Sequence, residues 1–291
     1  AQDSEPFVLL NYTDTLRDVM TMAHELGHGM HFAYSRRQTP LSFHAPLALC
    51  EVPSTFAELL VFDRMLEVEE DPATRGALVR GELESGFATV FRQTMMVRYE
   101  QDAYGARGEG QALTPERLSA FWLDRNQRYY GDSMELPEGY RLGWSYIPHF
   151  IHTRFYTYAY AFAHLASLVL YGLYRDEGAA SFVPRYQRLL ETGGASAPGD
   201  QLGAFGIDLV DVATWRRGLD EMERMLDAAL AGNPRVAEVH AELERVENSL
   251  SDPEVYGNEK KLERALEQQH KLIDEYYSLG GDSYPARVRE L

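Results

Sequence analysis

Residues 23–31 read A-H-E-L-G-H-G-M-H and contain the pattern H-E-x-x-H. Side chains four positions apart lie on one face of a helix, so His24 and His28 can point their imidazoles at the same metal ion. Glu25 lies between them in sequence and turns aside, where it can take a proton from a water at that ion. Two imidazoles, one further protein ligand and a water make an open tetrahedral zinc site, and zinc lowers the pKa of that water. The stretch therefore predicts a helix that carries part of a catalytic zinc centre.

The residues around the motif support a helix with one packed face. Apolar residues recur at helical spacing on a face other than that of the histidines. They are Leu16, Val19, Met20, Ala23, Leu26, Met30 and Ala33. Thr13, Asp14 or Thr15 can cap the start of this helix, and residues 7–10 before it are typical of a short strand. The alternative is a pair of surface histidines beside a solvated glutamate, and the packed face argues against it.

A zinc site of this kind needs one more protein ligand, which should be a carboxylate or a histidine on a following element. Glu51 is the best candidate, because it stands 27 positions after His24 at the head of the next strongly helical stretch. Glu58 lies two turns further along that stretch. It can either hydrogen-bond a ligand histidine or be an ordinary glutamate on the helix surface.

Composition limits the class of protein. The chain has 291 residues, of which 45% are hydrophobic, enough for one large or two modest domains. No apolar run is long enough to span a bilayer, and the first residues do not read as a secretory signal. A single cysteine, Cys50, excludes an intrachain disulfide framework, so the cytoplasm is the expected compartment. The formal net charge of −17 leaves no basic face, and we expect neither a nucleic-acid nor a membrane partner.

Helical periodicity dominates the chain, and strands are scarce, so the fold is predicted to be mainly α. We expect residues 1–231 to form one catalytic domain and residues 232–291 to form a helical hairpin or coiled-coil tail. In the tail, apolar residues alternate by three and four from Val236 to Leu250 and return from Leu262 to Leu279.

Three separated motifs follow one another in the order H-E-L-G-H-G-M-H, E-V-P-S-T-F-A-E-L-L and W-S-Y-I-P-H-F-I-H-T-R-F-Y-T-Y-A-Y. They begin at His24, Glu51 and Trp144. In this order they resemble the oligoendopeptidase F branch of the thimet oligopeptidase family, and the resemblance covers residues 6–231. Three motifs in order are far more specific than a single H-E-x-x-H.

This resemblance implies a mainly helical, zincin-like catalytic domain that binds one zinc ion and cleaves short peptides. His24, His28 and Glu51 match the family's zinc ligands, and Glu25 matches its general base. These are the residues that the spacing argument also favours.

The third motif supplies hydrogen-bond donors for the carbonyl oxygen on which negative charge develops during peptide hydrolysis. By resemblance, His149 and Tyr158 match the histidine and tyrosine that the family places over the substrate. Members often carry a tyrosine two positions after that histidine, where this chain has Ile151. His152 and Tyr156 are therefore further candidates for the second donor. Core packing is the expected role of two other aromatic residues in the motif, Phe155 and Tyr160.

Two features depart from the family. Members carry a helical lobe upstream of the zinc motif, whereas only 23 residues precede His24 here. We therefore expect the catalytic half of a longer protein, a processed fragment or a truncated chain. The candidate partners, besides short peptides, are a second copy of the chain or an upstream lobe on another chain. Residues 234–291 instead resemble a helical segment inside the first ATPase domain of ABC-F proteins. This segment has no G-x-x-x-x-G-K-[ST] loop, so ATP binding is not expected.

The leading hypothesis is a zinc-dependent endopeptidase that hydrolyses short peptides. The alternative, from another class, is a catalytically weak zinc-binding half-domain that acts as a scaffold or interaction module through its helical tail. Peptide cleavage that a chelator abolishes would separate the two.

Overall fold

The computed structural model describes residues 5–231, positions 239, 242, 245 and 246, and residues 259–278. Helices make up the regular structure of these ranges, and none of the residues in them forms a strand. The predicted mainly α class is confirmed. No helix within the described ranges is both long and apolar enough to cross a membrane. The chain divides into two compact units, Ala1–Met65 with Glu84–Gly218, and Leu66–Leu83 with Leu219–Leu291.

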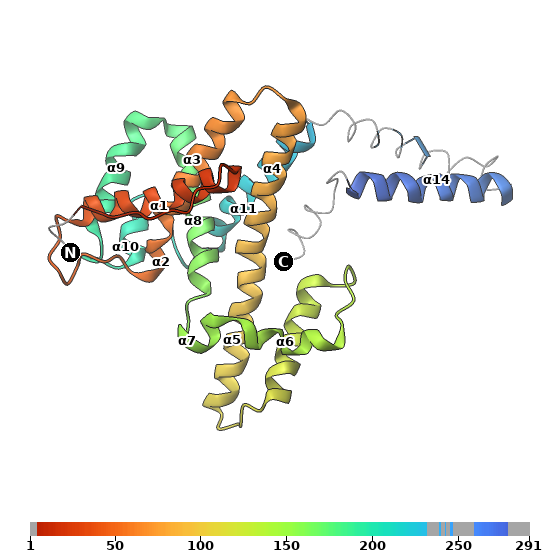
Figure 1. Cartoon of the computed structure of the whole chain (residues 1–291), viewed down its shortest axis with the longest axis horizontal. Coiled ribbons are helices and arrows are strands. Elements are labelled where there is room, and N and C mark those ends of the chain that lie inside the picture. The colour runs from red at the N-terminus through yellow and green to blue at the C-terminus, as the bar shows by residue number, and fades with distance from the viewer. Residues whose placement is uncertain (1–4, 232–238, 240–241, 243–244, 247–258, 279–291) are drawn as a thin grey trace. The chain divides into compact units, whose positions relative to one another are not determined.

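The first unit contains the candidate site residues. Figure 1 labels most of the helices named below. Its elements are α1 (Leu16–Ser35), α2 (Leu47–Cys50), most of α3 (Val52–Val68), the π-helical turn η1 (Ala88–Arg92), α5 (Gln93–Gly108), α6 (Pro115–Tyr130), the 3-10 helix η2 (Glu138–Tyr146), α7 (Pro148–His152), α8 (Tyr158–Glu177), α9 (Ala179–Thr192) and α10 (Pro198–Gly203). Three helices have residues in both units: α3, α4 (Pro72–Phe87) and α11 (Val212–Ala231).

Helix α8 lies at the centre of the first unit, in contact with α2, η1, α5 and α9. Its residues are apolar on nearly every side, which is the pattern of a helix surrounded by others. Its fully buried members include Ala159, Ala163, Ala166, Leu168 and Leu170. The hydroxyl of Ser167 donates to the Val52 carbonyl at 2.9 Å, which ties α8 to the start of α3. The start of α3 is therefore held in place beside the end of α2.

Helix α1 begins at the predicted place. The Thr15 hydroxyl accepts a hydrogen bond from the Asp18 backbone N–H at 3.2 Å, and the Asp18 carboxylate accepts one from the Thr15 N–H at 3.0 Å. This reciprocal pair is a capping box. Further along, α1 meets α3 backbone to backbone, because a Cβ atom at Gly27 would lie 2.5 Å from the Pro53 carbonyl oxygen. Only glycine permits this approach.

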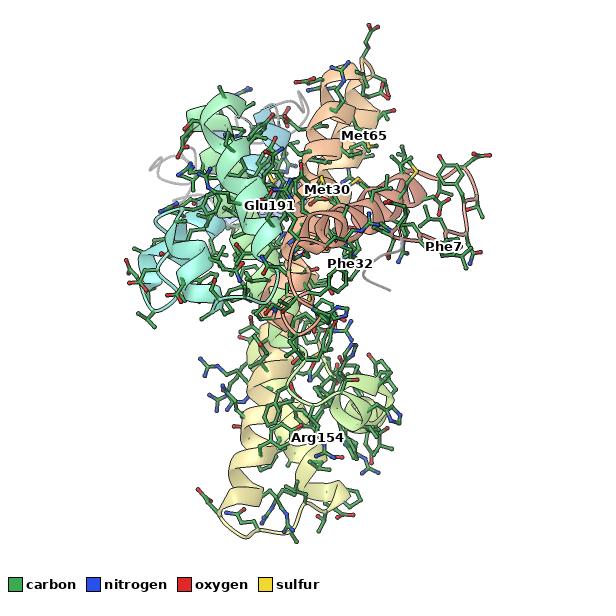
Figure 2. The ribbon with its side chains drawn as sticks, turned by 90° about the vertical axis from the view of Figure 1, so that its left-hand side faces the viewer. Phe7, Met30, Phe32, Met65, Arg154 and Glu191 are labelled. Atoms are coloured by element: carbon green, nitrogen blue, oxygen red, sulfur yellow. The ribbon has the colours of Figure 1, made fainter. Side chains whose placement is uncertain are left out.

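The predicted strand at residues 7–10 is wrong. These residues form neither helix nor strand, and Phe7 is 87% exposed at the outer edge of the first unit (Figure 2). A strand needs a neighbour to pair its N–H and C=O groups. No second strand exists in the ranges that the structure describes, so the extended pattern of this stretch has no sheet to join.

The structure also contains a break that the sequence pattern does not indicate. Residues 153–157 separate α7 from α8, and Phe155 has a positive φ of 57°. Such a backbone is rare for a bulky residue and lies outside the right-handed helical region. The break decides which aromatic residues of the third motif face the candidate site.

In the second unit, α14 (Glu259–Ser278) forms the predicted second helix of the tail. The first helix of the expected hairpin, with the turn after it, falls largely outside the described residues. The hairpin and the domain boundary near residue 231 therefore stay predictions.

Candidate metal centre

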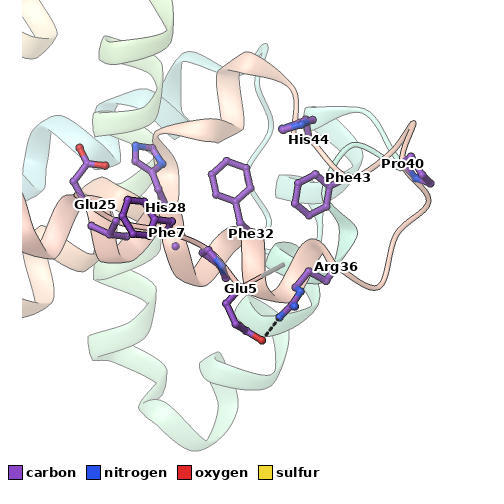
Figure 3. Close-up of a pocket in the computed structure, with 12 residues that line it drawn as sticks. Glu5, Phe7, Glu25, His28, Phe32, Arg36, Pro40, Phe43 and His44 are labelled. Atoms are coloured by element: carbon purple, nitrogen blue, oxygen red, sulfur yellow. Dashed lines mark hydrogen bonds and ion pairs between the residues drawn. The ribbon is translucent and has the colours of Figure 1, made fainter. Parts of the chain in front are cut away.

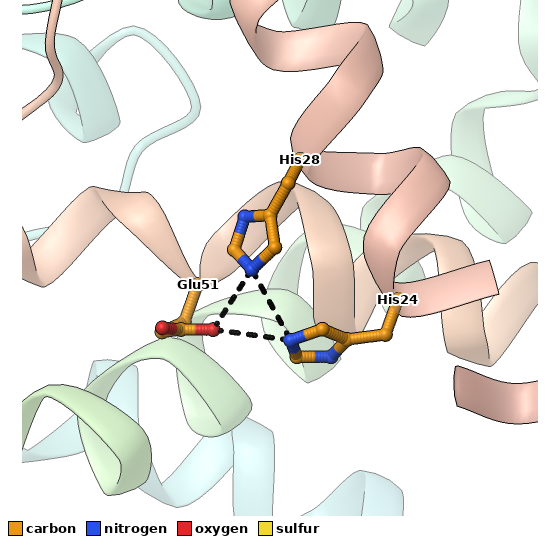
Figure 4. A group of neighbouring side chains, drawn as sticks. All are labelled: His24, His28 and Glu51. Carbon is orange, nitrogen blue, oxygen red and sulfur yellow. Dashed lines mark hydrogen bonds and ion pairs between the residues drawn. The ribbon is translucent and has the colours of Figure 1, made fainter. Parts of the chain in front are cut away.

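The two motif histidines of α1 and the carboxylate before α3 face one another (Figure 4). The Nε2 atoms of His24 and His28 are 3.2 Å apart. Oε2 of Glu51 lies 3.3 Å from the first and 3.4 Å from the second. Ligand atoms bound tetrahedrally to zinc at about 2.0–2.1 Å lie about 3.3 Å from one another. The spacing and the donor chemistry of this triangle therefore fit one zinc ion.

A hydrogen bond fixes the orientation of His24. Its Nδ1 atom donates to Oε1 of Glu58, which lies in the second turn of α3. This bond leaves the Nε2 atom of His24 facing the triangle. A carboxylate behind a ligand histidine sets the tautomer and raises the basicity of the ring. Of the two roles that the sequence left open for Glu58, the structure therefore shows the contact with the histidine.

The charges of the centre favour a cation between its members. Burial lowers the pKa of His24, but the bonds to Glu51 and Glu58 outweigh it and raise that pKa to about 10. Burial works to raise the pKa of Glu51, yet its contacts with His24 and His28 hold that pKa well below the usual range. The carboxylate thus stays ionised, and positive charge at this position is strongly preferred.

Ser54 also contributes to the centre, and the sequence reasoning missed it. Its buried hydroxyl lies 2.9 Å from the Glu51 carbonyl oxygen and 3.3 Å from Glu51 Oε2, and it can donate its one hydrogen to either. A serine three positions after a carboxylate at the head of a helix is the local signal that could have found it. The contact restrains the only carboxylate of the triangle.

Glu25 lies beside His28 in the wall of a cavity of about 440 Å³ (Figure 3). The far wall is aromatic: the ring of Phe32 stacks on Phe43 with centroids 5.7 Å apart, and Phe43 meets His44 edge-on at 4.9 Å. The other lining residues are Glu5, Pro6, Phe7, Val8, Gly29, Arg36 and Pro40. The predicted general base therefore opens onto a space large enough for a peptide side chain.

From the third motif, Tyr156 reaches the triangle. Its hydroxyl donates to Oε1 of Glu51 at 3.4 Å, and its ring lies 5.2 Å from that of Tyr160. Burial, the nearby Glu51 charge and Tyr160 raise the pKa of Tyr156 to about 12. This tyrosine therefore keeps its proton and can act as a neutral donor. His149 stands behind it, with its Nε2 atom hydrogen-bonded to the Tyr160 hydroxyl at 3.2 Å.

Tyr158 and His152 are not brought to the triangle. Tyr158 is 40% exposed and His152 is exposed, and within the described ranges neither makes a hydrogen bond or ring contact with the triangle or with Tyr156. Tyr158 and Tyr160 are two positions apart on α8, which amounts to a rotation of about 200°. Tyr158 therefore turns away from the side on which Tyr160 meets His149 and Tyr156.

The expected core packing of Phe155 and Tyr160 is also corrected. Phe155 is 60% exposed because its left-handed backbone directs the side chain outward. Tyr160 is half-buried and bonds to His149 rather than only filling space.

Comparison with known protein families gives a match that covers every residue of the first unit. Residues 1–221 match the protein family described as Peptidase family M3. The chain belongs to peptidase family M3. This family membership agrees with the oligoendopeptidase F resemblance that the three motifs predict, and the match ends before the tail.

Three relatives illustrate the M3 assignment. Oligopeptidase PepF of Bacillus subtilis (strain 168) is 33% identical over 234 residues, which are 78% of this chain and 35% of the relative. A crystal structure of a Chlamydophila abortus protein described as a peptidase superposes with a TM-score of 0.71 at 31% identity, covering 80% of this chain and 39% of the other. Oligoendopeptidase-F from Enterococcus faecium gives a TM-score of 0.58 at 27% identity, covering 73% and 40%. The chain therefore spans less than half of the length of these M3 relatives.

Proposed function

We propose that this chain is the zinc-binding part of an endopeptidase that hydrolyses short peptides. The observation that carries the proposal is the triangle of His24, His28 and Glu51, whose ligand atoms are spaced for one metal ion. The names of the M3 relatives, oligopeptidase and oligoendopeptidase, support short peptides as the substrate class. When bound, zinc supplies a Lewis acid for the peptide carbonyl and lowers the pKa of a water toward neutrality.

Glu25 is assigned the proton transfer. Its position beside His28 in the cavity wall supports this role. The carboxylate takes a proton from the attacking water as the water oxygen bonds to the carbonyl carbon. It then gives that proton to the amine nitrogen as the C–N bond breaks, so the carboxylate ends the cycle ionised.

Tyr156 is assigned the stabilisation of the carbonyl oxygen. Its hydroxyl is already aimed at Glu51, and the raised pKa keeps the proton in place for donation. The His149–Tyr160 pair supports the ring from behind. A donor role for Tyr158 and His152 stays a prediction from the motif alone.

The cavity beside Glu25 is assigned the binding of a bulky apolar side chain of the peptide. The stacked rings of Phe32 and Phe43 give it an apolar wall, and Glu25 and His28 line the same space. A side chain held there would lie within reach of the proton acceptor, which is what cleavage next to that residue requires.

The proposal is tested by incubating the purified chain with a quenched fluorescent peptide, with and without a chelator, beside the variant Glu25→Gln. We expect cleavage that the chelator abolishes and zinc restores. Glu25→Gln should bind zinc in the parental amount and lose turnover by about a hundredfold or more. Parental turnover in this variant would overturn the assignment of the base.

The alternative function is a zinc-binding scaffold. It rests on the same triangle of His24, His28 and Glu51 and differs from the peptidase in requiring no cleavage. Full zinc occupancy with no cleavage of any peptide in a mixed library would support the scaffold and reject the peptidase.

A further inference from the structure

Glu100 of α5 is a buried acidic residue outside the metal centre. It is 5% exposed, and its carboxylate accepts three hydrogen bonds. They come from the Thr157 hydroxyl at 2.6 Å, the Phe155 backbone N–H at 3.2 Å and the Tyr104 hydroxyl at 3.3 Å. A buried carboxylate is unfavourable unless donors surround it. These three bonds are therefore what allows Glu100 to be buried here.

Two of the three donors belong to the break between α7 and α8. Phe155 and Thr157 are the residues immediately before and after Tyr156, so one carboxylate holds both neighbours of that tyrosine. Phe155 has a φ of 57°, and its exposed ring lies 4.6 Å from the ring of Tyr104. A left-handed backbone at a bulky residue persists only where the surroundings enforce it. The bond from the Phe155 N–H to Glu100 acts at that same residue.

The direction of Tyr156 follows from this anchoring. Its hydroxyl reaches Oε1 of Glu51 at 3.4 Å, whereas Tyr158, two positions later, is exposed. A continuous chain of contacts thus runs from Glu100 through the backbone of residues 155–157 to Tyr156, and from Tyr156 to the carboxylate of the metal triangle.

We propose that Glu100 is a positioning residue that holds Tyr156 against the metal centre. It acts through the backbone on either side of the tyrosine and does not line the cavity beside Glu25. The effect expected on catalysis rests on the proposed peptidase function, whereas the effect on the 155–157 segment does not.

Three substitutions separate hydrogen bonding from charge and from simple loss of packing. Glu100→Ala removes all three acceptors. Glu100→Gln keeps them, because its amide oxygen can accept from Phe155 and Tyr104 while its NH₂ group donates to the Thr157 oxygen. Thr157→Val removes one bond and preserves the shape of a fully buried side chain.

The matched control is Asp102→Asn, two positions away on α5. Asp102 forms a two-fold ion pair with Arg125 of α6, at 2.6 and 2.7 Å, and has no bond to the 155–157 segment. This control reports what a general weakening of α5 does to the protein.

The readouts are deuterium uptake of residues 153–158 in the metal-free full chain, zinc content, and kcat and KM of the zinc-loaded chain. We expect Glu100→Ala to speed exchange of the segment about tenfold or more, with Thr157→Val intermediate. The zinc content should stay parental. The kcat of Glu100→Ala should fall about tenfold or more while KM changes less than about twofold, because the misplaced donor acts in the transition state. Glu100→Gln and Asp102→Asn should stay near the parent in every readout.

Three results would overturn the proposal. One is parental exchange of residues 153–158 in Glu100→Ala, or in Thr157→Val should the alanine variant fail to fold. Another is a Glu100→Gln variant as impaired as Glu100→Ala, which would assign the role to charge. The third is an Asp102→Asn variant whose exchange of residues 153–158 and whose kcat change as much as those of Glu100→Ala. If the parent chain cleaves no peptide, the peptidase proposal fails, and the exchange measurements still decide whether Glu100 positions the segment.

Discussion

His24 and Glu58 are joined by a hydrogen bond between the imidazole Nδ1 atom on α1 and the carboxylate on α3. The bond fixes which ring nitrogen faces Glu51. It also ties α1, which carries the two histidines, to α3, which begins immediately after Glu51. The metal centre is thus supported from behind by a residue that does not itself belong to the triangle.

Loss of this support should weaken metal binding. The variant Glu58→Gln can no longer accept a charge-assisted bond from His24, and the ring loses basicity and restraint. We expect zinc affinity to fall about ten- to a hundredfold, measured by competition with a chromogenic chelator. Asp63→Asn, an exposed acidic position on the same helix, is the control and should keep parental affinity. Equal affinities in the parent and Glu58→Gln would contradict this role.

The close approach of α1 and α3 makes Gly27 sensitive to a single methyl group. Gly27→Ala places a Cβ atom 2.5 Å from the Pro53 carbonyl oxygen, so the helices must separate. We expect a loss of about 1–3 kcal/mol in the free energy of unfolding, measured with urea. Gly29→Ala, two positions along α1, is the matched control. Its Cβ atom would come no nearer than 3.6 Å to Val8, an ordinary contact. This control should be neutral or stabilising, because alanine favours a helix by about 0.5–1 kcal/mol over glycine. The same change in both variants would refute the crossing argument.

The aromatic wall of the cavity should decide which peptides are preferred. Phe43→Ala removes the ring that stacks on Phe32 at 5.7 Å. We expect kcat/KM to fall about ten- to a hundredfold for peptides with a bulky apolar residue beside the cleaved bond, with little change for alanine at that position. Leu41 lies in the same loop but is 98% exposed. Leu41→Ala should therefore leave kcat/KM unchanged for both kinds of peptide. If Phe43→Ala leaves the preference for bulky apolar peptides unchanged, the bulky side chain of the peptide binds somewhere other than this cavity.

His164 predicts how stability depends on pH. It is buried in α8, and desolvation lowers its pKa to about 4 from an ordinary value of 6.5. Between these two pH values the unfolded chain binds the proton and the folded chain does not, so stability is full above pH 6.5 and declines as the pH falls toward 4. His164→Gln removes the titration, and its free energy of unfolding should decline less over this window, by an amount on the order of 3 kcal/mol. Parallel declines in the parent and the variant, followed by urea unfolding at several pH values, would count against it.

The grouping of His24, His28 and Glu51 could be predicted because its geometry is local, whereas their binding of zinc stays a prediction. Two histidines four positions apart must share a face of α1. Glu51 can be identified from the sequence because it directly precedes the next long helical stretch. The capping of α1 by Thr15 is local in the same sense. The mainly α fold class follows from helical periodicity, which the structure confirms.

What could not be predicted depends on contacts distant in sequence. The choice of Tyr156 over Tyr158 is made by the break at residues 153–157, whose partner Glu100 stands more than fifty positions earlier. No local pattern encodes that bond. The wrong strand at residues 7–10 has a related cause, because a short apolar run says nothing about whether a sheet is present to accept it.

The backbone contact at Gly27 and Pro53 has a wider consequence for how this site can diverge. The distance between α1 and α3 is set by contact between main-chain atoms, whose size is the same in every sequence. Side-chain changes on the cavity walls would then alter the proposed peptide preference without moving His24, His28 and Glu51. No side chain at position 27 can adjust this separation gradually. Even a methyl group is too large for the space between Gly27 and the Pro53 carbonyl oxygen.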